Sequence, residues 1–452
     1  MAKKAKKIRN GNSLSLEIVN PNAAGIDIAD AEMQVCVPPR CCEDNNRKFG
    51  STTAELRKIS AWLKECGITM VAMEATGIYW ISLFSILQED GFDVVLTNAR
   101  DVINMVGQKT DENDAESIMV AHQYGLLKAS YQPENEVKRI RTVTRQRASL
   151  VEKAAQEVLR VQKALQQMNI KLSVVLSDVV GESGRRIIEA IIGGEHDPKA
   201  LASLADGRCK SSKAEIAAAL EGIWDESLIF VLRQNYEDYK HTCAHIEECD
   251  KKLEVMLCLY IAKINHGVLP EFIESGKSKA KGKPQAVKMD VERLANEMWG
   301  VNTFAIPGFS DLTVLMLMGE LGHAFPLKFR SADAFARWCN LAPNTKISGG
   351  KTLSSRVPKK KNKVGLILRK AASSLANAKN ELGNFYRRVR SRAGGKGANI
   401  ATAHKLALIF FNMVSKKEAY DPNKVGLNHE DLLKLKIARY QRELQKLTSQ
   451  GA

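Results

Sequence analysis

The sequence lacks the features of a membrane or secreted protein. No apolar run reaches the roughly 18 residues that a membrane-spanning helix needs. The first seven residues are basic and are not followed by the apolar stretch of a signal peptide. We therefore expect a cytoplasmic protein whose residues 1–20 form a disordered basic arm.

Cysteine is present without the patterns that give it a structural role. The chain has nine cysteines, an odd number, with no regular spacing and no CxxC pair. This excludes a disulfide scaffold and offers no zinc site, and it favours a reducing compartment.

Acidic residues are in deficit. The 452 residues include 67 Lys and Arg against 51 Asp and Glu, which gives a formal net charge of +16. Such an excess favours a polyanionic partner, most often nucleic acid, although a generally basic soluble protein remains an alternative. The length allows two or three domains with real cores.

Residues 21–133 predict an α/β domain. The apolar pattern indicates two strands around a turn within 23–37, after which helices and strands alternate. A hairpin followed by alternating elements fits an RNase H-like core with a mixed sheet. The expected further elements are helix 53–66, strand 68–73, helix 77–89, strand 92–97 and a helix from about Asp111.

The rest of the chain predicts mostly helix. Residues 134–274 form two long helices with an insert of short helices, which indicates a coiled-coil arm. Residues 275–290 are a basic, flexible linker. A mostly helical domain follows at 291–415, and 416–452 form a charged helical tail.

Four carboxylates lie on or directly after predicted strands and on a predicted helix of the α/β domain. Asp27 alternates with apolar neighbours on a strand, and Glu74 follows an apolar strand. Asp111 and Asp114 are three apart on a predicted helix, so they share a face. Acids in such settings need compensation, and Mg²⁺ (or Mn²⁺) prefers oxygen ligands. We interpret the four as a metal-dependent nuclease site, although Asp27 alone could be a turn residue and Asp111 a helix cap.

Short motifs follow one another along the chain in a fixed order: Gly-Ile-Asp (25–27), Met-Glu-Ala-Thr-Gly (73–77), Lys-Thr-Asp-x-x-Asp-Ala (109–115), Ser-Asp-Val-x-Gly (177–181), Gly-Glu-His-Asp-Pro (194–198), Ile-Pro-Gly-Phe (306–309) and Ile-Ser-Gly-Gly (347–350). In this order they resemble the motifs of the DEDD transposases of the IS110 family of bacterial insertion sequences. The motifs at 177–181 and 194–198 are similar to the IS1111 branch of that family.

The resemblance implies an RNA-guided DNA recombinase that moves its own element. A structured non-coding RNA of the element (bridge RNA or seekRNA) would pair with donor and target DNA. The RuvC-like domain would carry Asp27, Glu74, Asp111 and Asp114, and the C-terminal transposase domain would supply Ser348 as the nucleophile. Members act as dimers that pair into tetramers. The resemblance to enzymes of bacterial insertion sequences also implies a bacterial, nucleoid-associated protein.

Ser348 stands in a loop of glycines and lysines that suits a phosphate. A hydroxyl needs activation by a base or a metal before it attacks. A phosphoserine bond would conserve the energy of the phosphodiester, so rejoining needs no ATP. From the residues alone, an ordinary turn serine is the favoured interpretation of Ser348, because serine and glycine favour turns, and only the family resemblance favours a nucleophile.

Several basic residues are predicted to contact the phosphates of DNA or guide RNA, which position a complex without reading sequence. Solvated helix faces and a solvated loop are the alternatives. The absence of a base-reading motif fits sequence choice by guide pairing. The predicted residues are Arg139, Arg141, Arg145, Arg147, Lys346, Lys351, Arg356, Lys359, Lys360, Lys361 and Arg369.

Two other functions remain open at this point. The chain could be a metal-dependent junction endonuclease of the RuvC kind, whose C-terminal domain only binds DNA. It could also be a non-catalytic RNA-binding scaffold, although the presence of all four acids weighs against that.

Overall fold

The computed structural model describes residues 17–75, 77–97, 111–267, 285–358 and 362–424, and a few residues between 433 and 445. The basic arm, most of the basic linker and most of the tail lie outside these ranges. The chain divides into two compact units, Met1–Gln132 (unit 1) and Pro133–Ala452 (unit 2). The boundary adjoins residue 133, where we expect the N-terminal domain to end.

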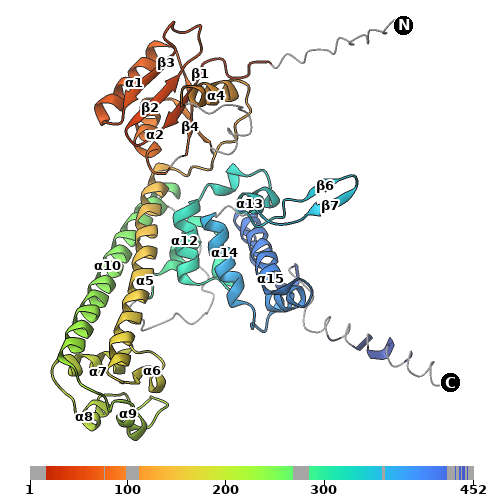
Figure 1. Ribbon diagram of the computed structural model, residues 1–452. Coiled ribbons are helices and arrows are strands. Elements are labelled where there is room, and N and C mark those ends of the chain that lie inside the picture. The colour runs from red at the N-terminus through yellow and green to blue at the C-terminus, as the bar shows by residue number, and fades with distance from the viewer. Residues whose placement is uncertain are drawn as a thin grey trace, which may run out of the picture. The chain divides into compact units, whose positions relative to one another are not determined.

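Unit 1 is built on a mixed five-stranded sheet of order β3-β2-β1-β4-β5 (Figure 1). The first three strands are antiparallel, and β4 and β5 run parallel to β1. This arrangement is the predicted RNase H-like sheet, so the expected fold class of unit 1 is confirmed. The strands are β1 (Ala23–Ile28), β2 (Glu32–Cys36), β3 (Asn46–Gly50), β4 (Met70–Glu74) and β5 (Asp93–Thr97).

Helices cover both faces of this sheet. Helices α1 (Thr53–Glu65) and α2 (Trp80–Glu89) share a core with one face, to which Ile26 and Ile28 contribute. Helix α4 (Asp111–Gln123) packs on the opposite face. The alternation of side chains along β1 therefore separates an apolar face from the face that carries the acid.

Strand β3 is missing from the sequence-based prediction. It lies at the edge of the sheet, and none of its five residues is fully buried. Edge strands often carry charged side chains, so the apolar alternation that reveals interior strands is absent here.

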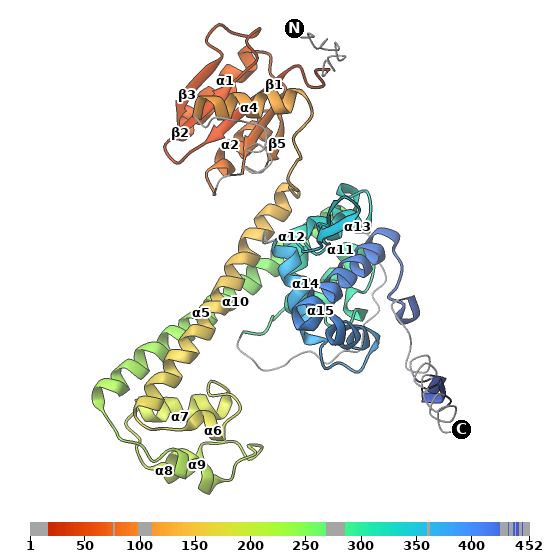
Figure 2. The same ribbon diagram turned by 45° about the vertical axis from the view of Figure 1, so that its right-hand side comes forward.

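Unit 2 begins with two long helices, α5 (Asn135–Gln167) and α10 (Glu226–Ile264), which lie side by side in Figures 1 and 2. They run antiparallel, since Glu136 pairs with Lys263 and Arg147 pairs with Asp250. This confirms the predicted long helical middle region. The insert between them contains α6 (Leu172–Val175), α7 (Glu182–Ile192), α8 (Pro198–Ser203) and α9 (Lys213–Ala219).

The C-terminal part of unit 2 is mostly helical, as predicted, and packs on α5. Gly319 of α12 lies so close to α5 that an added Cβ would be 2.7 Å from Oγ1 of Thr144. A hairpin of β6 (Lys346–Ser348) and β7 (Lys351–Ser354) interrupts the helices. The helices are α11 (Val291–Trp299), α12 (Asp311–Leu321), α13 (Ala332–Trp338), α14 (Lys363–Ser374) and α15 (Glu381–Lys416), which is kinked at Gly394.

Short 3-10 turns complete the described chain: η1 (Thr303–Ala305), η2 (Phe325–Lys328) and η3 (Pro422–Lys424). Among the helices of the described residues, none combines the length and the apolar character needed to cross a bilayer.

Candidate functional site

The carboxylate site of unit 1 is framed by an unusually close contact between β1 and α4. A Cβ added at Gly25 would lie 2.3 Å from both the carbonyl oxygen of Ala115 and the backbone nitrogen of Met119. Beside it, Ala72 of β4 packs against Ile118 of the same helix. Gly25 and Ala72 are paired across the two strands, so this face of the sheet lies directly against α4.

The two strand acids share that face. Asp27 is two residues beyond Gly25 and Glu74 is two residues beyond Ala72, and side chains two apart on a strand point the same way. The parallel register pairs Ile26 with Met73, and one residue further it places Asp27 beside Glu74. Both acids are partly buried and stand at the carboxyl ends of neighbouring parallel strands. This edge is where α/β sheets bind ligands.

Helix α4 brings Asp114 toward the same face. Asp114 directly precedes Ala115 and stands four residues before Ile118, both of which contact the sheet. Residues three or four apart on a helix share a face, and Asp114 is partly buried. Asp111 is the first residue of α4, and its side chain lies outside the described residues. The structure thus brings Asp27, Glu74 and Asp114 to one region of unit 1.

A fourth polar group in this region escaped the sequence analysis. Gln34 pairs with Asp27 across β1 and β2, so both side chains point to the same face. Its Nε2 donates to Oδ1 of Asn46 at 2.7 Å, whereas its buried Oε1 has no hydrogen-bond partner in the described chain. A buried acceptor without a donor carries a free-energy cost. A glutamine on an alternating strand gives no sequence signal by itself.

The chemistry of these groups fits a hard cation, which would take carboxylate and amide oxygens. Asp27, Glu74, Asp114 and Oε1 of Gln34 all supply acceptors and none of them is basic. Among the described residues, however, no three His, Cys, Asp or Glu side chains lie close enough to hold a metal ion.

Cys36 on the same sheet face is not a competing nucleophile. Burial, assisted by the carboxylate of Glu116, raises the pKa of its thiol to about 12. A thiol with such a pKa stays protonated and inert at neutral pH.

Ser348 occupies the end of the exposed hairpin of unit 2. It pairs with Lys351 across a two-residue turn whose glycines, Gly349 and Gly350, have φ values of 54° and 76°. Positive φ at both positions is typical of a type I′ turn, which explains the Gly-Gly pair. Ser348 is exposed, and its hydroxyl makes no hydrogen bond to any described residue. No base among the described residues therefore contacts this hydroxyl.

The arginines of α5 differ from the prediction. Arg147 is 1% exposed and pairs through Nε and Nη2 with Asp250, at 2.5 and 3.1 Å, and also donates to the carbonyl of Gln285. It does not reach the surface, so it holds α5, α10 and the described end of the linker together and is unavailable to nucleic acid. The prediction for Arg147 is wrong, because its charge is neutralised inside the unit.

Two more arginines of α5 donate hydrogen bonds to the same acidic residue. Arg145 donates to both carboxylate oxygens of Glu320, at 2.7 and 2.9 Å, and Arg141 donates to the backbone carbonyl of Glu320 at 2.6 Å. Glu320 is 7% exposed, so this contact seats α12 on α5. Arg139 is exposed and makes no ion pair within the described residues.

The cations near Ser348 are more accessible. Lys346, Lys351 and Arg356 are exposed, and none of the three forms an ion pair with a described residue. Arg369 is half-buried and donates to the carbonyl of Asn340 at 2.9 Å, which commits part of its guanidinium to the fold. Lys359, Lys360 and Lys361 lie outside the described residues.

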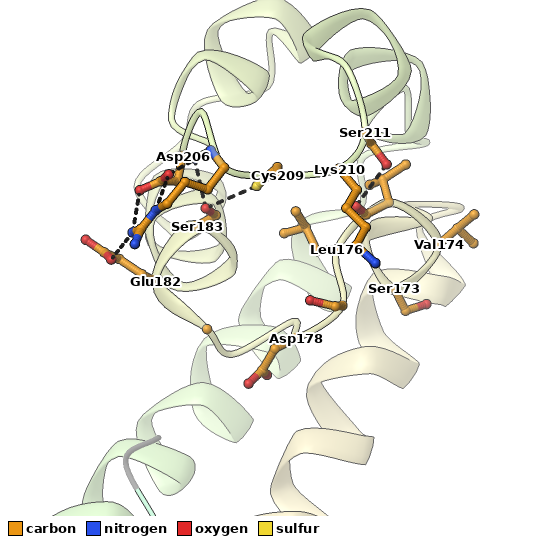
Figure 3. Close-up of a pocket in the computed structure, with 14 residues that line it drawn as sticks. Ser173, Val174, Leu176, Asp178, Glu182, Ser183, Asp206, Cys209, Lys210 and Ser211 are labelled. Atoms are coloured by element: carbon orange, nitrogen blue, oxygen red, sulfur yellow. Dashed lines mark hydrogen bonds and ion pairs between the residues drawn. The ribbon is translucent and has the colours of Figure 1, made fainter. Parts of the chain in front are cut away.

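A separate cavity of about 710 Å³ opens in the insert between α5 and α10 (Figure 3). Its lining includes the acids Asp178, Glu182 and Asp206, and its Arg208 pairs with Asp206 at 2.9 Å. Lys210 extends into the space in Figure 3. The excess of carboxylates makes this cavity a poor partner for a polyanion.

Two parts of the chain match models of known protein families. Residues 24–170 match the DEDD_Tnp_IS110 family model, described as a transposase, and residues 304–387 match the model described as Transposase IS116/IS110/IS902 family. The first match includes all four acids and the second includes Ser348. No curated protein sequence matches the chain.

The two matches together span about half of the chain and define its class, a DNA transposase of a mobile insertion sequence. Each matched region is similar to a domain of the IS110-family transposases. DNA is therefore its substrate, and DNA recombination is its activity.

Proposed function

We propose that this transposase is an RNA-guided DNA recombinase that cuts and rejoins strands through a phosphoserine at Ser348. We also assign it to the IS1111 branch of the family. The observation that supports the proposal is that Asp27 and Glu74 stand at neighbouring strand ends of unit 1, whereas the hydroxyl of Ser348 in unit 2 is exposed on a turn and makes no hydrogen bond to a described residue.

The acids have the role of holding Mg²⁺ at the scissile phosphate. Asp27 and Glu74 at adjacent strand ends, with Asp111 and Asp114 from α4, would hold the ion. When bound, it would supply charge stabilisation for the attacking and leaving oxygens. The support that Gly25 gives to α4 fixes the spacing between the strand acids and the helix.

Ser348 has the role of the nucleophile. Its Oγ forms a bond to phosphorus while the bond from phosphorus to one sugar oxygen breaks, and the hydroxyl proton passes to the departing sugar oxygen. A hydroxyl from another strand then attacks the phosphoserine and releases the serine. One phosphoester is exchanged for another at each step, so no cofactor such as ATP is consumed.

Sequence choice by a guide RNA is supported by the character of the exposed cations. Arg139, Lys346, Lys351 and Arg356 suit phosphates of either nucleic acid, and a protein that contacts only backbones can leave sequence reading to base pairing. We propose the element's own non-coding RNA as the guide, and dimers that pair into tetramers on the two DNAs.

The test is strand exchange by the purified full-length chain with its flanking non-coding RNA, donor and target DNA, and Mg²⁺. We expect a protein–DNA adduct that survives denaturation in the wild type and in the neighbouring control Ser354→Ala. Ser348→Ala should give none. An adduct that persists in Ser348→Ala would exclude the phosphoserine, and cleavage retained there without an adduct would favour the junction endonuclease.

The same assay tests the acids. Asp27→Asn keeps the size of the side chain and removes its charge, so we expect cleavage to fall about 100-fold or more with RNA binding retained. Chelation of Mg²⁺ should have the same effect. Cleavage at the wild-type rate in Asp27→Asn would refute the metal site.

A further inference from the structure

A second cavity in unit 2 adjoins the hairpin that carries Ser348. It has a volume of about 720 Å³ and lies between the base of this hairpin and α15. Its lining is mostly apolar, with Val357 after the hairpin and Ile400, Ala401 and Leu408 along α15. Its size is within the range of pockets that hold small organic ligands.

The hairpin connects this cavity to the serine. Asn344 donates its backbone N–H to the carbonyl of Arg356 at 3.0 Å, which closes the base of the hairpin. Ser348 and Lys351 flank the turn of the same hairpin. A strand that presents a phosphate to Ser348 can therefore follow the hairpin to the cavity.

An aromatic ring and cations line the cavity. Phe385 has Nζ of Lys405 at 4.7 Å from its ring centroid and the guanidinium carbon of Arg388 at 5.6 Å. Among the described residues that line the cavity, the charged ones are Arg356 and Lys405, both cationic. Burial lowers the pKa of His404, so its imidazole is neutral at pH 7 and can bond to a polar edge.

These features match a nucleotide. Nucleobases stack on aromatic rings whatever their sequence, and nearby cations pair with the phosphates. The cavity in the insert has a similar volume, yet three carboxylates line it and its arginine is already paired. The two cavities therefore differ in the charge of the residues that line them.

We propose that the cavity beside the hairpin binds one unstacked nucleobase of the DNA strand that is presented to Ser348. The base stacks on Phe385, and its neighbouring phosphates pair with Arg356 and Lys405. This inference rests on the proposed function and adds a contact that holds the strand in place before the exchange.

The C-terminal tail is the competing occupant. Leu433, Ile437 and Tyr440 recur at helical spacing and are 45%, 52% and 64% exposed. The described chain before them reaches Lys424, which lines a neighbouring pocket that shares Lys405 with this cavity. Residues 425–452, however, carry five Lys and Arg against three Asp and Glu, so their net charge opposes docking beside cations.

Photochemical crosslinking locates the base directly. Single-stranded DNA containing 5-iodouracil is irradiated with the full-length chain, and the attached peptide is identified by mass spectrometry. We expect attachment at Phe385. Attachment only outside the cavity, or attachment there with the matching RNA but not with DNA, would overturn the proposal.

Affinity measurements test the cavity independently. Ala401→Trp fills it, and we expect binding of single-stranded DNA and of duplex with one bulged base to weaken about tenfold. Binding of uninterrupted duplex should change less than twofold. The control is Leu259→Trp, since Leu259 is an exposed apolar residue of α10 outside the cavity. Unchanged binding by a folded Ala401→Trp protein would contradict the proposal.

Three further variants keep the result interpretable. Phe385→Ala should weaken binding as Ala401→Trp does, while Phe385→Tyr should retain it. If the Ala401→Trp protein fails to fold, these two variants test the proposal in its place. Ile437→Asp should leave binding unchanged; tighter binding would show that the tail occupies the cavity and would overturn the proposal. All binding is measured with and without Ser348→Ala, so failure of the serine chemistry leaves these results intact.

Discussion

Unit 2 contains two basic regions that look alike in the sequence and differ in the folded chain. Along α5, Arg147 is sealed against Asp250, and Arg145 is held by Glu320. On the hairpin, Lys346 and Lys351 are exposed and have no ion pair within the described residues. The two arginines of α5 form ion pairs that join elements of the fold, whereas the two lysines of the hairpin are exposed to solvent.

The difference shows that a cluster of cations indicates nucleic-acid binding only after its carboxylate partners are known. The acids that pair with Arg147 and Arg145 lie far along the chain, at positions 250 and 320. The hairpin is too short and too exposed to bring such partners to its own lysines, so its charge remains available for phosphates.

The largest effect should come from Arg147→Ala. It leaves Asp250 buried without its partner, and breaking a buried ion pair costs about 3–5 kcal/mol. Chemical denaturation should show a loss of this size in the free energy of unfolding. The matched control Arg139→Ala, on the exposed face of the same helix, should change it by less than about 0.5 kcal/mol. Equal effects of the two substitutions would remove the distinction between the two regions.

A smaller effect is expected in the hairpin turn. Gly350 has φ = 76°, and an L-residue with a side chain pays about 1–2 kcal/mol in that conformation. Gly350→Ala should therefore lower adduct formation about tenfold and leave global unfolding unchanged, because the hairpin is exposed. Gly350→Asn should lose less, since asparagine tolerates positive φ. A large shift in the unfolding curve of Gly350→Ala would show that the hairpin belongs to the core.

The smallest effect sharpens the contrast in phosphate contacts. Lys351→Gln should reduce the slope of log affinity against log salt by about one, without changing stability. Arg147→Met, if folded, should leave that slope unchanged because the guanidinium is buried. Titrations of DNA at several salt concentrations measure both. A reduced slope in Arg147→Met alone would reverse our assignment of the two regions.

Much of unit 1 follows from sequence because its signals are local. Apolar alternation identifies β1 and β4, and the position of Asp27 between Ile26 and Ile28 predicts that the acid emerges opposite the core. Strand β3 escaped because an edge strand needs no apolar face.

What could not be predicted depends on pairs distant in the chain. The bond between Arg147 and Asp250 spans 103 positions, and no local pattern signals it. The unsatisfied oxygen of Gln34 becomes meaningful only when the strand register places it beside Asp27. The hairpin around Ser348 is set by two glycines, which the sequence identifies as a turn but not as a strand pair.

The contact at Gly25 has a consequence for how this protein can diverge. A Cβ added at Gly25 would lie 2.3 Å from backbone atoms of α4. Because these atoms belong to the backbone, replacing a neighbouring side chain by a smaller one would not make room for it. A substitution at this position would push away the helix that bears Asp114, and folding and chemistry would decline together. At this position, therefore, no substitution can lower the activity and leave the stability of the fold unchanged.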